Sequence, residues 1–114
     1  MKYSSKEYIQ TEGLNWEDVA PGMKRQFMGY DDEIMMVKVK FDKGGIGARH
    51  AHIHSQTTYV VDGAFEVSIG DEKKVLRGGD GFYIPPNVEH GAVCLEDGIL
   101  IDVFSPIRED FMND

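Results

Sequence analysis

The fold is decided by residues 34–76, IMMVKVKFDKGGIGARHAHIHSQTTYVVDGAFEVSIGDEKKVL, in which short apolar runs alternate with glycine-containing breaks. The first run, residues 34–41, places apolar side chains on one side of an extended chain and lysines on the other: Met35, Val37, Val39 and Phe41 against Lys38 and Lys40. Alternation with a period of two is typical of a strand with one buried face. The stretch therefore predicts β structure.

The same pattern of runs and breaks continues on both sides of this stretch. We predict strands at residues 23–30, 34–41, 46–54, 57–61, 64–69, 73–76, 82–84, 90–95 and 99–104. Asp62-Gly63 is typical of a two-residue hairpin turn, and residues 70–72 and 96–98 predict two further turns. Pro85-Pro86-Asn87 predicts a loop, because proline lacks the N–H that a sheet requires. Eight or nine short strands in this length predict an all-β domain, a closed barrel or jelly roll.

Residues 1–22 interrupt this pattern. Asn15 to Val19 has the composition of a helical turn, but we interpret the whole segment as a peripheral N-terminal arm. The barrel domain then spans residues 23–114. With neither an internal repeat nor a linker, a chain of 114 residues predicts one domain.

The charge balance restricts the partners. There are 20 acidic against 12 basic side chains, for a formal net charge of −8. An acidic surface repels nucleic acid and anionic membranes, so we expect neither as a partner. No apolar run is long enough to span a bilayer, and the start MKYSSKEYIQTEG does not resemble a secretory signal. The single cysteine, Cys94, suits a reducing compartment, and we expect a cytoplasmic protein.

The four histidines are unevenly placed, at His50, His52, His54 and His90. Alternate side chains on an extended chain share a face, so His50 and His52 can present their imidazoles to one point. A bend near His54 would bring Gln56 to that point and turn His54 elsewhere, and His90 would arrive from a later strand. Imidazole is a common ligand of divalent transition metals, so the cluster predicts a metal site. The alternative is that these histidines are solvated surface residues.

The spacing of these residues resembles the two sequence motifs of the cupin superfamily. The first motif is matched at Gly44, His50, His52, Gln56 and Gly63, with Gln56 where glutamate is usual. The second is matched at Gly79, Pro85, Asn87 and His90, with Asn87 where glycine is usual and Cys94 where asparagine is usual. The resemblance implies a double-stranded β-helix, or jelly-roll barrel, in which His50, His52, Gln56 and His90 bind one divalent metal ion. His54 is then expected beside these ligands or at the surface.

The neutral amide of Gln56 affects the expected chemistry of the metal. Three histidines and an amide oxygen leave the charge of the ion in place, which favours Lewis-acid chemistry and attraction of anions. The set differs from the two-histidine, one-carboxylate arrangement of oxygen-activating iron enzymes, which argues against a dioxygenase. Nickel, manganese, iron, cobalt and zinc all accept such ligands, so the metal is not assigned.

The predicted strand at residues 99–104 carries a charged residue, Asp102, on the same face as Leu100 and Phe104. A carboxylate buried in an apolar strand without a partner is costly. Either this face opens onto a polar cavity or Asp102 is paired. The alternative is that Asp102 lies at a solvent-exposed edge and that Arg108 pairs with an acidic neighbour.

Four segments of the chain resemble the KdgF-like family of pectin-degradation proteins. They are NWED, MMVKVKFDKGGIGARHAH, YVVDGAFEVSIGDEKKVL and YIPPNVEHGAVCLEDGILIDVFSPIREDF, so the resemblance covers Trp16 to Phe111. It implies a metal-dependent, isomerase-type enzyme that converts cyclic 4,5-unsaturated uronates, released by pectin or alginate lyases, into linear 4-deoxy-5-keto-uronates. Asp102 would act as acid/base, Arg108 would clamp the substrate's carboxylate, and Phe104 would pack on the sugar.

Two alternative functions are also compatible with the sequence. One is a non-catalytic cupin that binds a sugar or a metal as a sensor module, and the other is a cupin dioxygenase. Small cupins commonly pair through their sheets and N-terminal arms, so the resemblance also implies a homodimer. Four further residues are candidates for contact with a small anionic sugar, although the sequence does not place their side chains: Arg25, Arg49, Tyr59 and Tyr83.

Overall fold

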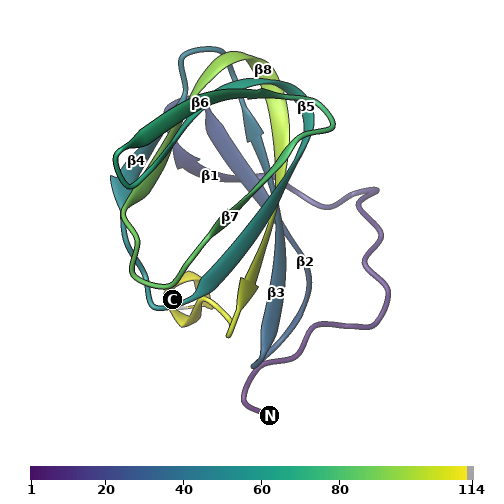
Figure 1. Cartoon of the computed structure of the whole chain (residues 1–114). Helices are drawn as coiled ribbons and strands as arrows, with labels where there is room; N and C mark the ends of the chain where they lie inside the picture. Colours follow the sequence, from purple (N-terminus) through teal and green to yellow (C-terminus); the bar gives the residue numbers. More distant parts are fainter. Residues whose placement is uncertain (113–114) are drawn as a thin grey trace.

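The computed structural model describes residues 1–112, which form eight strands and one short 3-10 helix (Figure 1). The strands are β1 (Glu17–Ala20), β2 (Met23–Asp31), β3 (Ile34–Phe41), β4 (Ile46–His50), β5 (Ser55–Ile69), β6 (Glu72–Arg77), β7 (Gly81–Ile84) and β8 (His90–Ser105). The helix, η1 (Glu109–Met112), follows β8. The predicted all-β fold is confirmed.

Two long strands, β5 and β8, organise the barrel. They pair with each other in antiparallel fashion along their whole length, from Ser55 opposite Ser105 to Ile69 opposite His90. One half of β5 also pairs with β7 and the other half with β6, while β8 pairs with β4 near its start and with β3 near its end. The strands β2 and β1 continue the sheet beyond β3. Figure 1 shows these strands curling around a common interior, the predicted jelly-roll arrangement.

Two predicted turns lie inside the long strands. The hairpin predicted at Asp62-Gly63 is wrong, because β5 continues through it with shifts in its pairing register. The turn predicted at residues 96–98 is likewise part of continuous β8. Gly63 has a φ of 86°, and a Cβ there would lie 2.5 Å from the carbonyl oxygen of Asp97. The glycine therefore lets the two backbones approach and bend together, which is how bulged strands turn the corner of a barrel.

The N-terminal segment packs along the outer strands of the barrel. Glu17–Ala20 pair with β2 as a strand, where the sequence had the composition of a helical turn. Further upstream, the backbone N–H groups of Lys2 and Tyr3 donate hydrogen bonds to the carboxylate of Asp32. Part of the segment predicted as an arm is thus integral to the sheet.

The core lies on the inner faces of β3, β5 and β8. The alternation predicted for residues 34–41 is confirmed, since Met35, Val37, Val39 and Phe41 are all buried. The rings of Phe41 and Phe65 meet edge to face, with their centroids 5.2 Å apart. None of the helical structure in residues 1–112 has the length and apolar character needed to cross a membrane.

Candidate functional site

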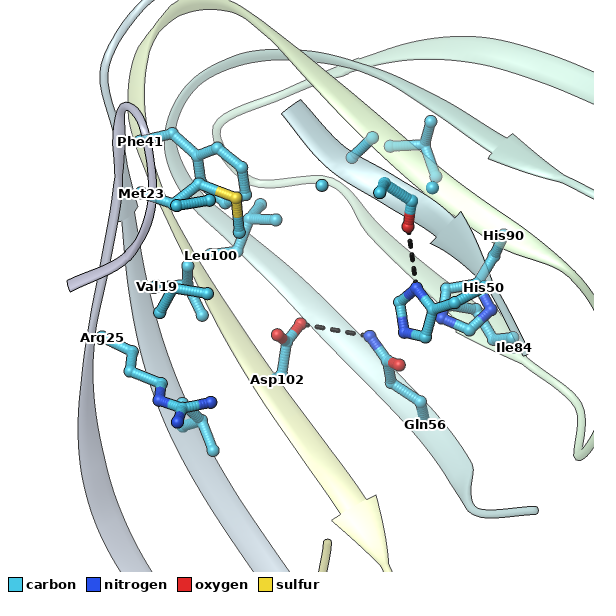
Figure 2. A pocket seen from close by; sticks show the side chains of 18 of the residues that line it. Val19, Met23, Arg25, Phe41, His50, Gln56, Ile84, His90, Leu100 and Asp102 are labelled. Carbon is cyan, nitrogen blue, oxygen red and sulfur yellow. Dashed lines mark hydrogen bonds between the residues drawn. The ribbon is translucent and has the colours of Figure 1, made fainter. Parts of the chain in front are cut away.

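A cavity of about 380 Å³ occupies the barrel interior beside the core. Six of the seven residues predicted for the site line it: His50, Gln56, His90, Asp102, Phe104 and Arg108. The seventh, His52, packs against two of them, with its ring centroid 4.8 Å from that of His90 and 5.7 Å from that of Phe104. Figure 2 shows Asp102 and Gln56 joined by a hydrogen bond, with His50 and His90 on the far side of Gln56 from Asp102. The fold thus brings all of the predicted site residues together.

Three imidazoles converge at one end of this cavity. Ligand nitrogens of His50, His52 and His90 all lie within 4.8 Å of one another. His50 ends β4 and His90 begins β8, and the two residues are directly paired across the sheet. Directly paired residues project to the same face, which places these two rings together, while the loop after β4 adds His52. The cluster has the geometry to hold one metal ion.

Backbone carbonyls orient all three rings. The Nδ1 atoms lie 2.8 Å from Ala48 O for His50, 2.9 Å from Val88 O for His90 and 3.2 Å from His54 O for His52. When Nδ1–H donates to a carbonyl, Nε2 carries a free lone pair, which is the arrangement usual for histidines that bind metals. Burial lowers the pKa of His52, and it lowers the pKa of His90 to about 4. The rings of His52 and His90 are therefore neutral near pH 7.

The Nε2 atom of His90 is buried and has no hydrogen-bond partner within residues 1–112. A buried polar atom without a partner is costly, so the histidine cluster needs a bound partner for this atom. A divalent ion bound by Nε2 would satisfy this atom. The donor set present in the chain therefore fits a metal ion.

Gln56 links the imidazoles to the carboxylate. Its Nε2 donates to Thr58 Oγ1 at 3.0 Å and to Asp102 Oδ1 at 3.2 Å, so its Oε1 is turned toward the histidines. Oε1 lies 3.0 Å from His52 Nε2. When the proton of His52 is on Nδ1, these two facing atoms are both acceptors, and a shared cation would satisfy them. Gln56 can thus complete a four-atom donor set.

His54 lies beside this cluster and does not belong to it. Its Nε2 is 3.1 Å from the carbonyl oxygen of Ile107 in the segment after β8. Its ring meets that of His52 edge to face, with centroids 5.3 Å apart. Burial, with the nearby Arg108 guanidinium, lowers the pKa of His54. The residue fixes the loop after β4 to the C-terminal segment, and it lies beside the predicted ligands, one of the two expected positions.

Asp102 faces the cavity from the centre of the sheet. β8 lies between β3 and β5, so the alternative that Asp102 occupies a solvent-exposed edge is wrong. Its Oδ1 accepts hydrogen bonds from the hydroxyl of Thr58, at 2.7 Å, and from Gln56. Burial raises the pKa of Asp102 to about 6, against the effect of these hydrogen bonds, which lower it. Both protonation states are thus accessible near neutral pH.

Arg108 and Phe104 form the neighbouring wall. Both side chains are buried, and the guanidinium carbon of Arg108 lies 5.1 Å from the Phe104 ring centroid and 4.2 Å from that of Phe111. Arg108 Nε and Nη2 donate to the two carboxylate oxygens of Asp110 at 3.0 and 2.8 Å. Arg108 therefore pairs with an acidic neighbour and lines the cavity at the same time, which combines two predictions that the sequence left as alternatives.

Sequence reasoning missed Thr58, whose hydroxyl joins Gln56 to Asp102. Its position two residues after Gln56 was a usable signal, because the two side chains share one face of a strand. Of the four further candidates, Arg25 lines the cavity. The other three are exposed and lie outside its lining: Arg49, Tyr59 and Tyr83.

Comparison with known proteins places this chain in a family. A cupin domain model matches residues 37–104. The pectin degradation protein KdgF of Dickeya dadantii (strain 3937) is 45% identical over 109 residues, which cover 94% of this chain and 99% of that protein. The structure of KdgF from Halomonas sp. aligns with a TM-score of 0.89 and 43% identity over 94% of this chain and 99% of that one. An RmlC-like cupin from Shewanella frigidimarina NCIMB 400 aligns with a TM-score of 0.92 and 52% identity, over 95% and 97% of the two chains.

Proposed function

This chain belongs to the KdgF family of single-domain cupins, and we propose that it is a metal-dependent enzyme that opens cyclic 4,5-unsaturated uronates to linear 4-deoxy-5-keto-uronates. The name of its Dickeya relative, a pectin degradation protein, supports a pectin-derived sugar as substrate. The observation that carries the proposal is the presence of the imidazole cluster, a carboxylate and a buried guanidinium in one cavity. These are the groups needed to bind an anionic sugar and move a proton.

The residues that would hold one divalent ion are His50, His52 and His90, through Nε2, and Gln56, through Oε1. When bound, the ion supplies Lewis-acid polarisation of oxygen atoms of the substrate. These four donors are neutral, so they preserve a positive centre that favours an anionic ligand. Nickel, manganese, iron, cobalt and zinc all accept such donors.

The proposed reaction breaks one bond and moves one proton. In the reactant, the ring oxygen joins C1 to C5, and a double bond joins C4 to C5. In the product, C1 is an aldehyde, C5 is a ketone and C4 carries one more hydrogen. The C1 hydroxyl thus loses its proton as the bond between C1 and the ring oxygen breaks, and C4 gains a proton. Reactant and product are isomers, so no oxidant or reductant is needed.

Asp102 would move this proton. Thr58 and Gln56 both donate to its Oδ1, and no hydrogen bond within residues 1–112 engages its Oδ2. One oxygen is therefore held in place while the other is free for a ligand in the cavity. A carboxyl group fixed in this way is suited to general acid–base catalysis.

Arg108 would bind the carboxylate of the substrate. Its Nε and one proton of Nη2 are engaged by Asp110, and its Nη1 has no hydrogen-bond partner within residues 1–112. Nη1 and the second proton of Nη2 form a planar fork that matches the two oxygens of a carboxylate. Phe104, on the same wall, would cover one face of the sugar and exclude water.

The loss of ultraviolet absorbance of the conjugated double bond tests these roles. Asp102→Asn is expected to lower kcat by about 100- to 10,000-fold, since it removes the acid–base group. Arg108→Ala is expected to raise KM by about 10-fold or more, since it removes a charge-assisted hydrogen bond. His52→Ala should reduce the metal content measured by mass spectrometry. Full activity in both of the first two variants would contradict the assigned roles, and retention of the uronate without conversion would indicate a binding protein.

We also propose that the chain forms a homodimer through the outer face of β3, β8, β5 and β7. Exposed or half-buried apolar side chains gather there around one hollow: Met36, Tyr59, Tyr83, Ile101 and Val103. Met36 is paired with Val103, and Tyr59 with Ile101, so they form a continuous patch across neighbouring strands. Contiguous apolar surface of this kind is typical of association sites. We also propose that residues 1–22 contribute to this interface. A cytoplasmic location is proposed as well, in keeping with the free thiol of Cys94.

A further inference from the structure

One charged side chain of the cavity has no role in the proposed function. The polar or charged residues among the described lining are Arg25, His50, Gln56, His90, Asp102 and Arg108. The rest of that lining is apolar apart from backbone. Five of the six are assigned to metal binding, proton transfer or the carboxylate clamp, and Arg25 is not.

Arg25 reaches the cavity from β2, on the side away from the histidines. Figure 2 shows it beyond Asp102, with Gln56, His50 and His90 on the other side of that carboxylate. Its side chain is only 17% exposed. A guanidinium that is mostly removed from water and faces a cavity is placed to meet a ligand there rather than the solvent.

Neighbouring groups hold this guanidinium in place. Its Nε and Nη2 donate to Glu17 Oε1, at 3.0 and 2.6 Å, from the neighbouring strand β1. Its central carbon lies 5.0 Å from the Phe27 ring centroid and 4.3 Å from that of Phe111. No hydrogen bond within residues 1–112 engages its Nη1. Arg25 is therefore positioned, and it keeps donors for a further acceptor.

Arg25 and Arg108 are arranged in the same way. Each guanidinium lies against the ring of Phe111, at 4.3 and 4.2 Å from its centroid, and each is bound by a carboxylate that is more than half exposed. Those two carboxylates, of Glu17 and Asp110, are screened by water, whereas the cations face the cavity. Asp102 is the only carboxylate among the described residues that line it. The charges of the cavity wall therefore favour an anion, even without the charge of a metal ion.

We propose that Arg25 is a second substrate-binding arginine, which donates a hydrogen bond to an oxygen of the bound uronate from the side opposite the histidine cluster. The ligand's identity rests on the proposed function. Arg25 and Arg108 together would offset the negative charge of the substrate and of Asp102. Glu17, whose carboxylate accepts the hydrogen bonds from Nε and Nη2 of Arg25, is a positioning residue that links β1 to the site.

The test compares Arg25→Gln and Arg25→Lys with the unaltered protein. Loss of a charge-assisted hydrogen bond is expected to raise KM for the unsaturated uronate by about 10- to 100-fold in Arg25→Gln, with kcat changed less than about 3-fold. Arg25→Lys keeps the charge and should recover part of the affinity. The matched control is Arg77→Gln. Arg77 is an exposed arginine on β6, outside the cavity, and it donates a hydrogen bond to Glu96 at 3.0 Å. Metal content and thermal melting confirm that each variant is folded and loaded.

Two outcomes separate this inference from the proposed function. If the unaltered protein converts the uronate and Arg25→Gln does so with the same KM, the role of Arg25 is wrong and the function stands. If the unaltered protein converts neither the pectin-derived nor the alginate-derived uronate, the proposed function is wrong. Calorimetric titration with galacturonate, the saturated monosaccharide, then decides the inference without turnover. Weaker binding by Arg25→Gln than by Arg77→Gln supports it, and equal affinity, or no binding by the unaltered protein, overturns it.

Discussion

Gln56 joins the histidine cluster to Asp102 through one side chain. Its oxygen lies 3.0 Å from His52 Nε2, and its nitrogen lies 3.2 Å from Asp102 Oδ1. An amide has an acceptor end and a donor end, so it can face a cation on one side and a carboxylate on the other. A glutamate, the usual residue at this point of the cupin motif, would place two carboxylates in contact. The glutamine is therefore compatible with a free carboxylate at Asp102, and a glutamate is not.

Gln56→Glu is predicted to lower turnover by about 10-fold or more while the metal is retained. Two carboxyl groups about 3 Å apart share one proton, so Asp102 would no longer be free to exchange its own. The added negative charge would also weaken the attraction of an anionic substrate. Initial rates from ultraviolet absorbance, with the metal measured in the same sample, check both parts. A metal-loaded Gln56→Glu protein with undiminished turnover would show that the amide is not required.

The strands β5 and β8 carry most of the site because each passes through both halves of the barrel. Gln56 and Thr58 belong to the first half of β5, and His90 and Asp102 belong to opposite ends of β8. The corner that permits this is crowded. A Cβ on Gly63 would lie 2.5 Å from the carbonyl oxygen of Asp97 and 2.6 Å from the Cα of Gly98. The bend thus depends on glycines in both strands.

Gly63→Ala is predicted to destabilise the fold by about 2–4 kcal/mol, since it combines an unfavourable φ with a backbone clash. Gly70→Ala is the matched control. Gly70 also has a positive φ, of 57°, in the turn before β6, but a Cβ there would meet nothing within 4 Å. Its expected cost is about 1 kcal/mol. Urea unfolding of the two variants measures the difference, and equal losses would mean that the corner is not tightly packed.

Much of the fold follows from local sequence patterns. The predicted bounds of residues 34–41 are those of β3, because alternation of apolar side chains is a local property of a strand with one buried face. The error at Asp62-Gly63 is different in kind. Hairpin turns and bulges both need a residue that tolerates positive φ, so the same dipeptide serves either. Only the pairing of β5 with β8, across a long sequence separation, distinguishes them.

The candidate site was likewise predicted only in part from the sequence. His50, His52, Gln56 and His90 were predicted from the spacing of the cupin motifs, and Asp102, Phe104 and Arg108 from the resemblance to the KdgF-like family. Thr58 escaped the prediction, and the side chain of Arg25 was not placed by it, since their contacts depend on how β5 faces β8 and on how β2 closes the barrel. Such contacts between distant strands leave no local pattern in the sequence.

The net charge of −8 and the chemistry of the cavity belong to different parts of the molecule. The described lining of the cavity includes two arginines and one carboxylate, whereas residues such as Glu17 and Asp110 are largely exposed. Charge in a water-poor cavity acts more strongly than charge on a screened surface. An acidic protein can therefore bind a small anion in its interior.

The apolar patch on the outer face of the barrel predicts that the protein is a homodimer in solution. The unaltered protein should have about twice the 12.8 kDa mass of one chain in light scattering. Met36→Lys combined with Tyr59→Lys should give monomers, because charge is introduced into the apolar patch. Val75→Lys is the control, since Val75 is a similarly exposed apolar residue, at 49%, on β6. A monomeric unaltered protein, or dimers of the double variant as tight as those of the control, would contradict the interface.

The central claim is that a metal held in this cavity lets the chain open an unsaturated uronate. The most direct test follows the pectin-derived and alginate-derived uronates by proton NMR with the metal-loaded protein, the chelated protein and the chelated protein after metal is restored. The signal of the C4 hydrogen of the double bond should disappear and C4 methylene signals should grow, with the loaded and restored protein only. A C4 signal that persists with the loaded protein, or that decays equally fast after chelation, would contradict the claim.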